Sequence, residues 1–214
     1  MRDVTRRSVL GGLAAVPVVG ALGARADTGP ALLQFAPPES GRETMRRRFF
    51  PNVELISHEG KHVRFYDDLL KDKIVVLNLM YANCESLCPV ITSHLVEVQK
   101  LLRTRVQEPV YIYSLTIKPD EDTPAKLREY ATMHHAGGNW LFLTGKPDDL
   151  ELLRFKLGYN DPKPERDRAD KSLHSGMLRY GNEPLSLWGS CQGSATPGWI
   201  AEEISFVAPH RRPS

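Results

Sequence analysis

The sequence predicts an α/β domain in which a central mixed sheet has helices on both faces. Apolar runs typical of strands covered on both sides alternate with segments whose apolar residues recur at helical spacing. Strands that alternate with helices tend to pair in parallel and to pack those helices against the sheet. A length of 214 residues allows one well-buried domain of this kind and is too short for two.

Seven segments have the composition of strands, because they combine apolar or alternating residues with flanking turn residues. They are residues 53–56, 62–65, 74–80, 110–116, 140–143, 174–180 and 185–187. The first two form a predicted hairpin around Gly60. The last two form a second predicted hairpin, with its turn at residues 181–182, which adds antiparallel edges to the sheet.

Helices are predicted between these strands. They start near Cys88, at Thr123-Pro124, at Pro147 and at Thr196-Pro197. Threonine followed by proline is a clear start signal, because the threonine caps the helix and the proline fits its first position. The helix from Pro147 is predicted to end at Gly158, and residues 159–172 are predicted to be loop. This order of elements matches a thioredoxin-like layout.

Residues 1–26 are predicted to be a twin-arginine-type signal peptide. Arg6 and Arg7 directly precede an apolar stretch, and Ala24 and Ala26 supply the small residues that a signal peptidase reads. The stretch has about 14 residues where a spanning helix needs roughly 20, which favours a cleaved signal over a membrane anchor. An ordinary secretory signal is the alternative. Either signal predicts a periplasmic protein, tethered to the membrane only if the signal is retained.

Residues 27–48 are predicted to be a flexible arm and residues 49–214 the folded domain. The arm is rich in proline and glycine and has little periodicity. Across the chain, 41% of residues are hydrophobic and 25% charged, as in ordinary soluble domains. The net charge is only +2 and the basic residues are scattered, so no nucleic-acid partner is expected.

Cys84 and Cys88 lie where the strand 74–80 is followed by a helix. A spacing of four places both sulfurs on one side of the first helical turn, and the helix N-terminus favours thiolates. Two soft thiolates suit Cu(I), and an added imidazole also suits Cu(II), whereas zinc needs a fourth ligand. A plain disulfide or two buried thiols is the other interpretation. The end of a central strand is where open α/β sheets place their sites, which favours a functional pair.

The spacing of this pair also bears on its reactivity. Thioredoxin-type oxidoreductases use Cys-x-x-Cys, whereas three residues separate Cys84 from Cys88. Glu85 lies between the two thiols, and its negative charge is expected to raise their pKa values and slow nucleophilic attack. The same charge favours a bound cation.

Four segments of the chain, in the same order and spacing, resemble the SCO/SenC family. They are residues 81–89, 114–124, 143–145 and 174–175, and the resemblance extends over about residues 49–180. It implies a thioredoxin fold, an extracytoplasmic location and copper bound by Cys84, Cys88 and His174. It also implies a role as metallochaperone or thiol reductant for the binuclear copper subunit of cytochrome oxidase.

The chain departs from the family pattern close to the expected ligands. Lys118 stands where the family usually has an acidic residue, and Leu173 where an aspartate precedes the histidine. Glu85 and Ser86 replace a proline and an aspartate after the first cysteine. These changes keep the three expected ligands but alter the groups around them, which tune metal affinity.

Other residues with metal-binding or reactive side chains are expected to be structural. His94, His134 and His135 lack motif support, and His94 is expected to face away from the cysteines. The expected core residues are Met80, Met133 and Met177, with thioether contacts to copper as the alternative. Cys191 is expected to be a free or packed thiol, and Asp120 and Asp122 to be cap and turn residues.

Two functions follow from the same pair of cysteines. The first is a copper-binding assembly factor that needs no turnover chemistry. The second is a thiol-disulfide oxidoreductase that acts on the cysteines of a partner protein. His174 separates them, because a Cu(II) site needs an imidazole and a reductase does not. A thiol peroxidase would need an arginine beside one activated cysteine, and no motif supplies one.

Overall fold

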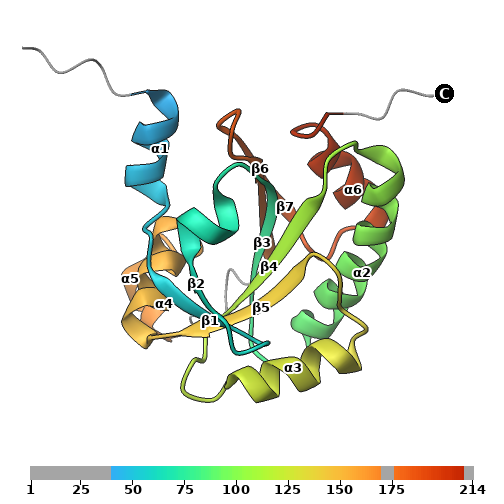
Figure 1. Cartoon of the computed structure of the whole chain (residues 1–214). Coiled ribbons are helices and arrows are strands. Elements are labelled where there is room, and N and C mark those ends of the chain that lie inside the picture. Colours follow the sequence, from blue (N-terminus) through green and yellow to red (C-terminus); the bar gives the residue numbers. More distant parts are fainter. Residues whose placement is uncertain (1–39, 170–175, 210–214) are drawn as a thin grey trace, which may run out of the picture. The chain divides into compact units, whose positions relative to one another are not determined.

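A computed structural model describes residues 40–169 and 176–209. Within these ranges seven strands form one sheet in the order β2-β1-β5-β4-β3-β6-β7 (Figure 1). The strands are β1 (Glu54–Ser57), β2 (His62–Arg64), β3 (Ile74–Met80), β4 (Val110–Thr116), β5 (Trp140–Gly145), β6 (Met177–Asn182) and β7 (Leu187–Gln192). Strands β3, β4 and β5 pair in parallel and the other neighbours antiparallel, so the predicted mixed sheet is confirmed.

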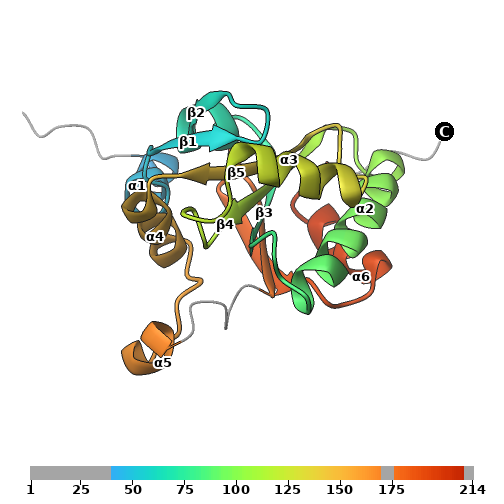
Figure 2. The same cartoon turned by 90° about the horizontal axis from the view of Figure 1, so that it is seen from below.

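Helices lie on both faces of this sheet (Figure 2). They are α1 (Gly41–Phe49), the π-helix η1 (Phe65–Leu70), α2 (Leu87–Arg105), α3 (Pro124–Met133), α4 (Pro147–Lys156), α5 (Pro164–Ala169) and α6 (Pro197–Ser205). One hydrophobic cluster joins the sheet to α2, α3 and α6, and the other joins it to η1 and α4. None of the helices in the described ranges is both long and apolar enough to cross a membrane.

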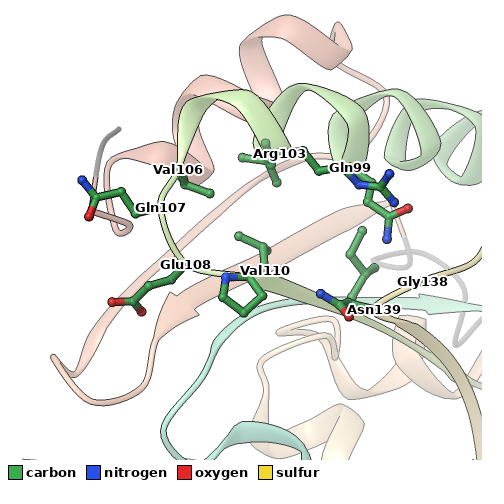
Figure 3. Close-up of a pocket in the computed structure, with 11 residues that line it drawn as sticks. Gln99, Arg103, Val106, Gln107, Glu108, Val110, Gly138 and Asn139 are labelled. Atoms are coloured by element: carbon green, nitrogen blue, oxygen red, sulfur yellow. The ribbon is translucent and has the colours of Figure 1, made fainter. Parts of the chain in front are cut away.

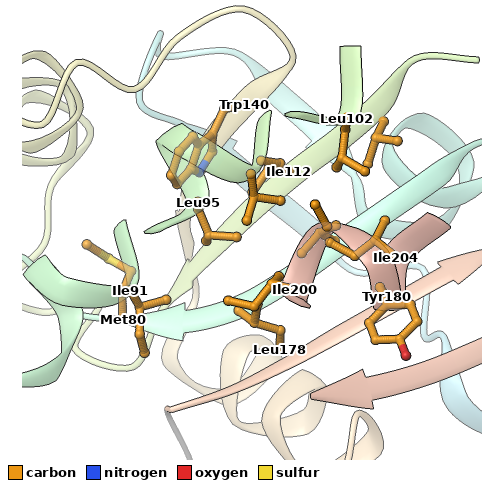
Figure 4. Packing of buried hydrophobic residues seen from close by; sticks show 14 of the residues in the cluster. Met80, Ile91, Leu95, Leu102, Ile112, Trp140, Leu178, Tyr180, Ile200 and Ile204 are labelled. Carbon is orange, nitrogen blue, oxygen red and sulfur yellow. The ribbon is translucent and has the colours of Figure 1, made fainter. Parts of the chain in front are cut away.

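Strand β3 lies between the two clusters, as its uninterrupted apolar run predicts. All of its residues are buried, and successive side chains point to opposite faces. Val76 belongs to the cluster under α2 and α6, whereas Val75 and Leu77 belong to the cluster under η1 and α4. Figure 4 shows the first cluster, in which side chains of α2 and α6 meet those of β4, β5 and β6.

Asn78, the polar residue within β3, has a hydrogen-bond partner on a neighbouring strand. Asn78 accepts a hydrogen bond from Ser114 Oγ at 2.7 Å, and Ser114 Oγ accepts one from Trp140 Nε1 at 2.9 Å. All three residues are buried, so an unpaired amide here would cost about 1–3 kcal/mol. The chain of bonds links β3, β4 and β5 across the middle of the sheet.

Residues 41–48 of the predicted arm form helix α1 instead. Ser40 caps this helix by accepting a hydrogen bond from the Glu43 amide at 3.2 Å. Arg42 donates two hydrogen bonds to the buried Glu183, at 2.7 and 2.5 Å, and so attaches α1 to the turn after β6. The sequence predicted no helix here because Glu183, the partner of Arg42, lies 141 positions away in sequence. The rest of the arm and the predicted signal peptide lie outside the described residues.

The predicted loop 159–172 contains the short helix α5. Asp167 of α5 accepts two hydrogen bonds from the buried Arg154 of α4, at 2.7 and 2.5 Å. Six helical residues carry no apolar periodicity, so sequence patterning gives no signal for them. The long-range ion pair holds the helix in place.

The second hairpin differs from its prediction in register. Strand β6 continues through Gly181 and Asn182, the turn occupies residues 183–186, and β7 begins only at Leu187. Gly181 lies opposite Trp188, where a Cβ would come within 2.3 Å of the indole. Likewise a Cβ at Gly189 would come within 2.6 Å of Tyr180. These two glycines therefore allow the strands to approach each other closely and do not form the turn.

Candidate metal and thiol site

Cys84 and Cys88 meet between the end of β3 and the first turn of α2. Both are buried, with exposed fractions of 7% and 3%, and neither is in a disulfide. The Cys84 amide donates to the Tyr81 carbonyl at 3.2 Å, which turns the chain back after the strand. The Cys88 amide donates to Cys84 Sγ at 3.4 Å. The sulfur therefore caps the helix in place of Ser86, whose side chain makes no cap bond.

The two thiols have opposite pKa shifts. Burial raises the pKa of Cys84, but hydrogen bonds from the Cys88 thiol and from the amides of Cys88 and Ser86 outweigh it and lower the pKa to about 6. Burial, together with the bond to Cys84, raises the pKa of Cys88 to about 12. At neutral pH the pair therefore holds one thiolate beside one thiol.

The predicted effect of Glu85 on these thiols is wrong. Its side chain is exposed and is not among the groups that shift the pKa of Cys84 or Cys88. Water screens an exposed carboxylate, whereas the amides of the helix N-terminus act on the sulfur at close range. The local geometry therefore favours a thiolate at Cys84 despite the neighbouring acid.

Alkylation of the metal-free, reduced protein should reveal this difference. We expect iodoacetamide to modify Cys84 first, with a rate that rises as the pH passes through about 6, because the thiolate is the nucleophile. Mass spectrometry of peptides would locate the adduct at each pH. A Cys191→Ala variant should behave like the native chain, and a rate that rises only near pH 9 would contradict the assignment.

Asp122 holds the loop that carries Cys84. It is 1% exposed and accepts hydrogen bonds from Thr116 Oγ1 at 2.6 Å and from the Ala82 amide at 3.1 Å. Lys126 Nζ lies 3.7 Å from the same carboxylate. The prediction of a turn residue is therefore incomplete, because Asp122 joins the end of β4 to a loop 40 positions earlier. No local sequence signal could have shown this.

Lys118 lies beside the same loop. Its Nζ is 4.6 Å from the centre of the Tyr81 ring, a cation–π distance. A hydrogen bond from the Tyr81 side chain in turn contributes to the lowered pKa of Cys84. Lys118, which departs from the family pattern, therefore contacts Tyr81, and Tyr81 in turn contacts the Cys84 sulfur.

The other predicted ligand, His174, lies outside the described residues, as does Leu173. In the described ranges no three His, Cys, Asp or Glu side chains are grouped as a metal site. His94 Nδ1 lies 3.1 Å from the Gly193 carbonyl oxygen, which gives that ring a structural partner. His134 caps the end of α3, and His135 follows it with a φ of 55°.

The remaining candidates divide between core and surface. Met80 is buried in the same cluster as both cysteines, and Met177 packs against the other cluster. Met133 is 72% exposed, so its interpretation as a core residue is wrong. Cys191 is a buried free thiol within β7, and burial, with the charge of Glu203, raises its pKa to about 12.

A cavity of about 340 Å³ lies at the opposite end of the sheet (Figure 3). Gln99 and Arg103, from the second half of α2, line it together with Val110, the first residue of β4. The cysteines follow the other end of the parallel strands. This cavity is therefore separate from the thiol pair.

Comparison with known proteins identifies the family. A sequence model described as SCO1/SenC matches residues 41–198. The SCO1 protein homolog of Bacillus subtilis is 30% identical over 123 residues, 55% of this chain and 60% of that protein. A SCO2-like protein of Rickettsia conorii is 29% identical over 133 residues, 60% of this chain and 62% of that protein. The alignments thus span about three fifths of each relative.

Solved structures share the fold. Arabidopsis thaliana ScoI with copper bound has a TM-score of 0.59 at 17% identity, covering 72% of this chain and 93% of that one. Yeast Sco1 with copper bound has a TM-score of 0.58 at 18% identity, covering 71% and 86%. These likenesses confirm the predicted thioredoxin-like fold. The match of the family model over residues 41–198 shows that this chain belongs to the SCO1/SenC family.

Proposed function

We propose that this protein binds copper as cargo through Cys84, Cys88 and His174 and delivers it to a respiratory copper protein. The observation that carries the proposal is the meeting of two buried, reduced cysteines at the start of α2. Thiolates are soft ligands that select Cu(I), and a nearby imidazole also suits Cu(II). The donor set therefore fits copper chemically, and the structures of the Arabidopsis and yeast relatives have copper bound.

Each group around the thiols has a role in this proposal. The Cys88 amide and the α2 N-terminus hold Cys84 as a thiolate, so that one ligand is ready before the metal arrives. Cys88 must lose its proton to bind, which makes binding release a proton. Asp122 fixes the loop between the strand and the helix, so the two sulfurs keep their separation.

Location and acceptor belong to the same proposal. The signal-like residues 1–26 support a periplasmic protein. A solved relative from the same fold group, BsSco, is described as a member of the Sco family of cytochrome c oxidase assembly proteins. The binuclear copper subunit of cytochrome oxidase is accordingly the acceptor that we propose for this chain.

Anaerobic titration of the reduced protein tests the copper proposal. We expect one Cu(I) per chain, measured by metal analysis after competition with a chromogenic chelator. His174→Ala should weaken Cu(II) binding and its thiolate-to-metal absorption much more than Cu(I) binding, because imidazole matters more to Cu(II). His94→Ala is the matched control and should change neither. Equal loss of both oxidation states, or of neither, would remove His174 from the ligand set.

The pKa difference between the thiols supports a second candidate, a thiol-disulfide oxidoreductase. The Cys84 thiolate would attack a partner's disulfide and release one partner sulfur as a thiolate. Cys88 would then displace the second, leaving the partner reduced and Cys84 bonded to Cys88. Fast reduction of a general disulfide substrate by the His174→Ala variant, with copper lost to a weak chelator, would favour this function over copper delivery.

A further inference from the structure

The two edges of the sheet differ in a way that bears on binding. Edge strand β2 has three residues and carries His62 and Arg64, features that discourage pairing with another strand. Edge strand β7 has six residues, Leu187–Gln192, without a charge or a proline. It pairs only with β6 in the described part of the chain, where the Gln192 carbonyl accepts a hydrogen bond from the Ala195 amide at 3.1 Å and no other bond from the outer backbone groups of β7 is found. Strand β7 is therefore free to accept a further strand.

An open groove of about 390 Å³ lies beside this edge. Its walls are mainly apolar and include Met45 and Phe49 of α1 and Trp188 of β7, each partly exposed. Aromatic and methionine side chains of this kind are enriched at protein interfaces. A partner side chain could therefore be buried here without any rearrangement of the core.

The groove also carries positive charge without a matching acid. Lys156 and Arg179 are among its lining residues, and no acidic residue is. Arg179 donates to the Gly158 carbonyl at 2.8 Å, but its buried Nε has no hydrogen-bond partner within the described residues. No ion pair to either cation is found in those residues. An occupant that combines an apolar side chain with a carboxylate would complement the groove.

Strand β7 also leads toward the thiols. After its last residue, Gln192, the Gly193 amide donates to the Gly176 carbonyl at 2.8 Å. A Cβ at Gly193 would lie 3.0 Å from Ile91, which is one turn of α2 beyond Cys88. A strand added along β7 would therefore have one end beside the first turn of α2.

We propose that the β7 edge and this groove bind an extended, acidic segment of the copper-accepting protein. The segment would add a strand to β7, place an apolar side chain against Phe49 and Trp188 and a carboxylate against Lys156 and Arg179. Backbone pairing supplies affinity in this mode of recognition, and the side-chain pockets supply specificity. The identity of the partner rests on the proposed function, whereas the chemistry of the surface does not.

Two synthetic probes of the same length as β7 test the surface. One is the peptide acetyl-Glu-Thr-Phe-Thr-Glu-Thr-amide, in which the phenylalanine and both glutamates share one face of an extended strand, and the other has lysine in place of both glutamates. We expect the acidic peptide to bind at least about tenfold more tightly than the basic one and to shift the amide NMR signals of β7. Equal affinities, or shifts that avoid β7, would overturn the proposal. Dimerisation of the chain through β7, detected by sedimentation and preventing peptide binding, would overturn it as well.

Substitutions in the groove separate its charge from its structure. Ser190→Glu places an acid beside the cations and should weaken the acidic peptide at least about tenfold, whereas Ser190→Gln should not. Lys156→Gln should weaken it about threefold, and Lys100→Gln on α2 is the matched surface control. All four variants should keep one Cu(I) per chain. Failure to bind the peptide while Cu(I) is still bound would therefore count against the β7 surface alone. Failure to bind Cu(I) would count against the proposed function alone.

Discussion

Replacing Cys84 or Cys88 with serine is expected to reduce Cu(I) affinity by at least about a hundredfold. Groups around a metal site typically change affinity by 10–100-fold, and a direct ligand should do at least as much. Serine keeps the size of the side chain but replaces a soft thiolate with a hydroxyl that binds Cu(I) poorly. Competition with a Cu(I) chelator under anaerobic conditions would measure the loss.

The third cysteine supplies the control for this experiment. Cys191 is buried like the other two, so Cys191→Ser tests whether loss of any buried thiol disturbs the fold enough to release copper. We expect Cys191→Ser to bind one Cu(I) with the native affinity. Tight binding by both Cys84→Ser and Cys88→Ser would refute the thiolate site altogether.

Replacing Asp122 with alanine is expected to lower the free energy of unfolding by about 2–4 kcal/mol. The change leaves two donors, the partly buried Ala82 amide and the buried Thr116 hydroxyl, without their acceptor, and each such loss costs about 1–3 kcal/mol where the donor is shielded from water. Urea denaturation of the metal-free protein would measure the difference. We also expect the reactivity of Cys84 toward iodoacetamide to change, because the loop that positions its sulfur loses its anchor.

Two further variants make the Asp122 result specific. Asp122→Asn keeps the shape and one acceptor oxygen, so it should cost less than alanine. Asp120→Ala removes an exposed carboxylate two positions earlier and should stay within about 0.5 kcal/mol of the native chain. If Asp120→Ala destabilises the protein as much as Asp122→Ala, the buried hydrogen bonds are not the cause.

The central part of the fold was predictable because each of its elements carries its own pattern. The run 74–80 is apolar throughout, and β3 has the predicted bounds. Thr123 followed by Pro124 predicted the start of α3, where Thr123 accepts a hydrogen bond from the Lys126 amide at 3.3 Å. Such signals are local, and the structure preserves them.

The elements that were missed depend on partners far along the chain. Helix α1 is mostly charged, and its attachment rests on Arg42 and Glu183. Of the site, the meeting of the two cysteines was predicted from their spacing on one helical turn, but Cys84 lies in the loop before α2 and meets Cys88 by capping the helix. The role of Asp122 and the low pKa of Cys84 could not be predicted, since both depend on how a loop, a strand end and a helix N-terminus meet.

The paired rings and glycines of the last hairpin also determine how firmly its strands are aligned. Tyr180 faces Gly189 and Trp188 faces Gly181, so each ring lies over a position without a side chain. A slip of β7 by one residue would drive the indole into a neighbouring side chain and exchange the two faces of the strand. The hairpin is therefore locked in one register. An incoming strand would meet a template that is already ordered, so association would not have to pay the entropic cost of aligning it.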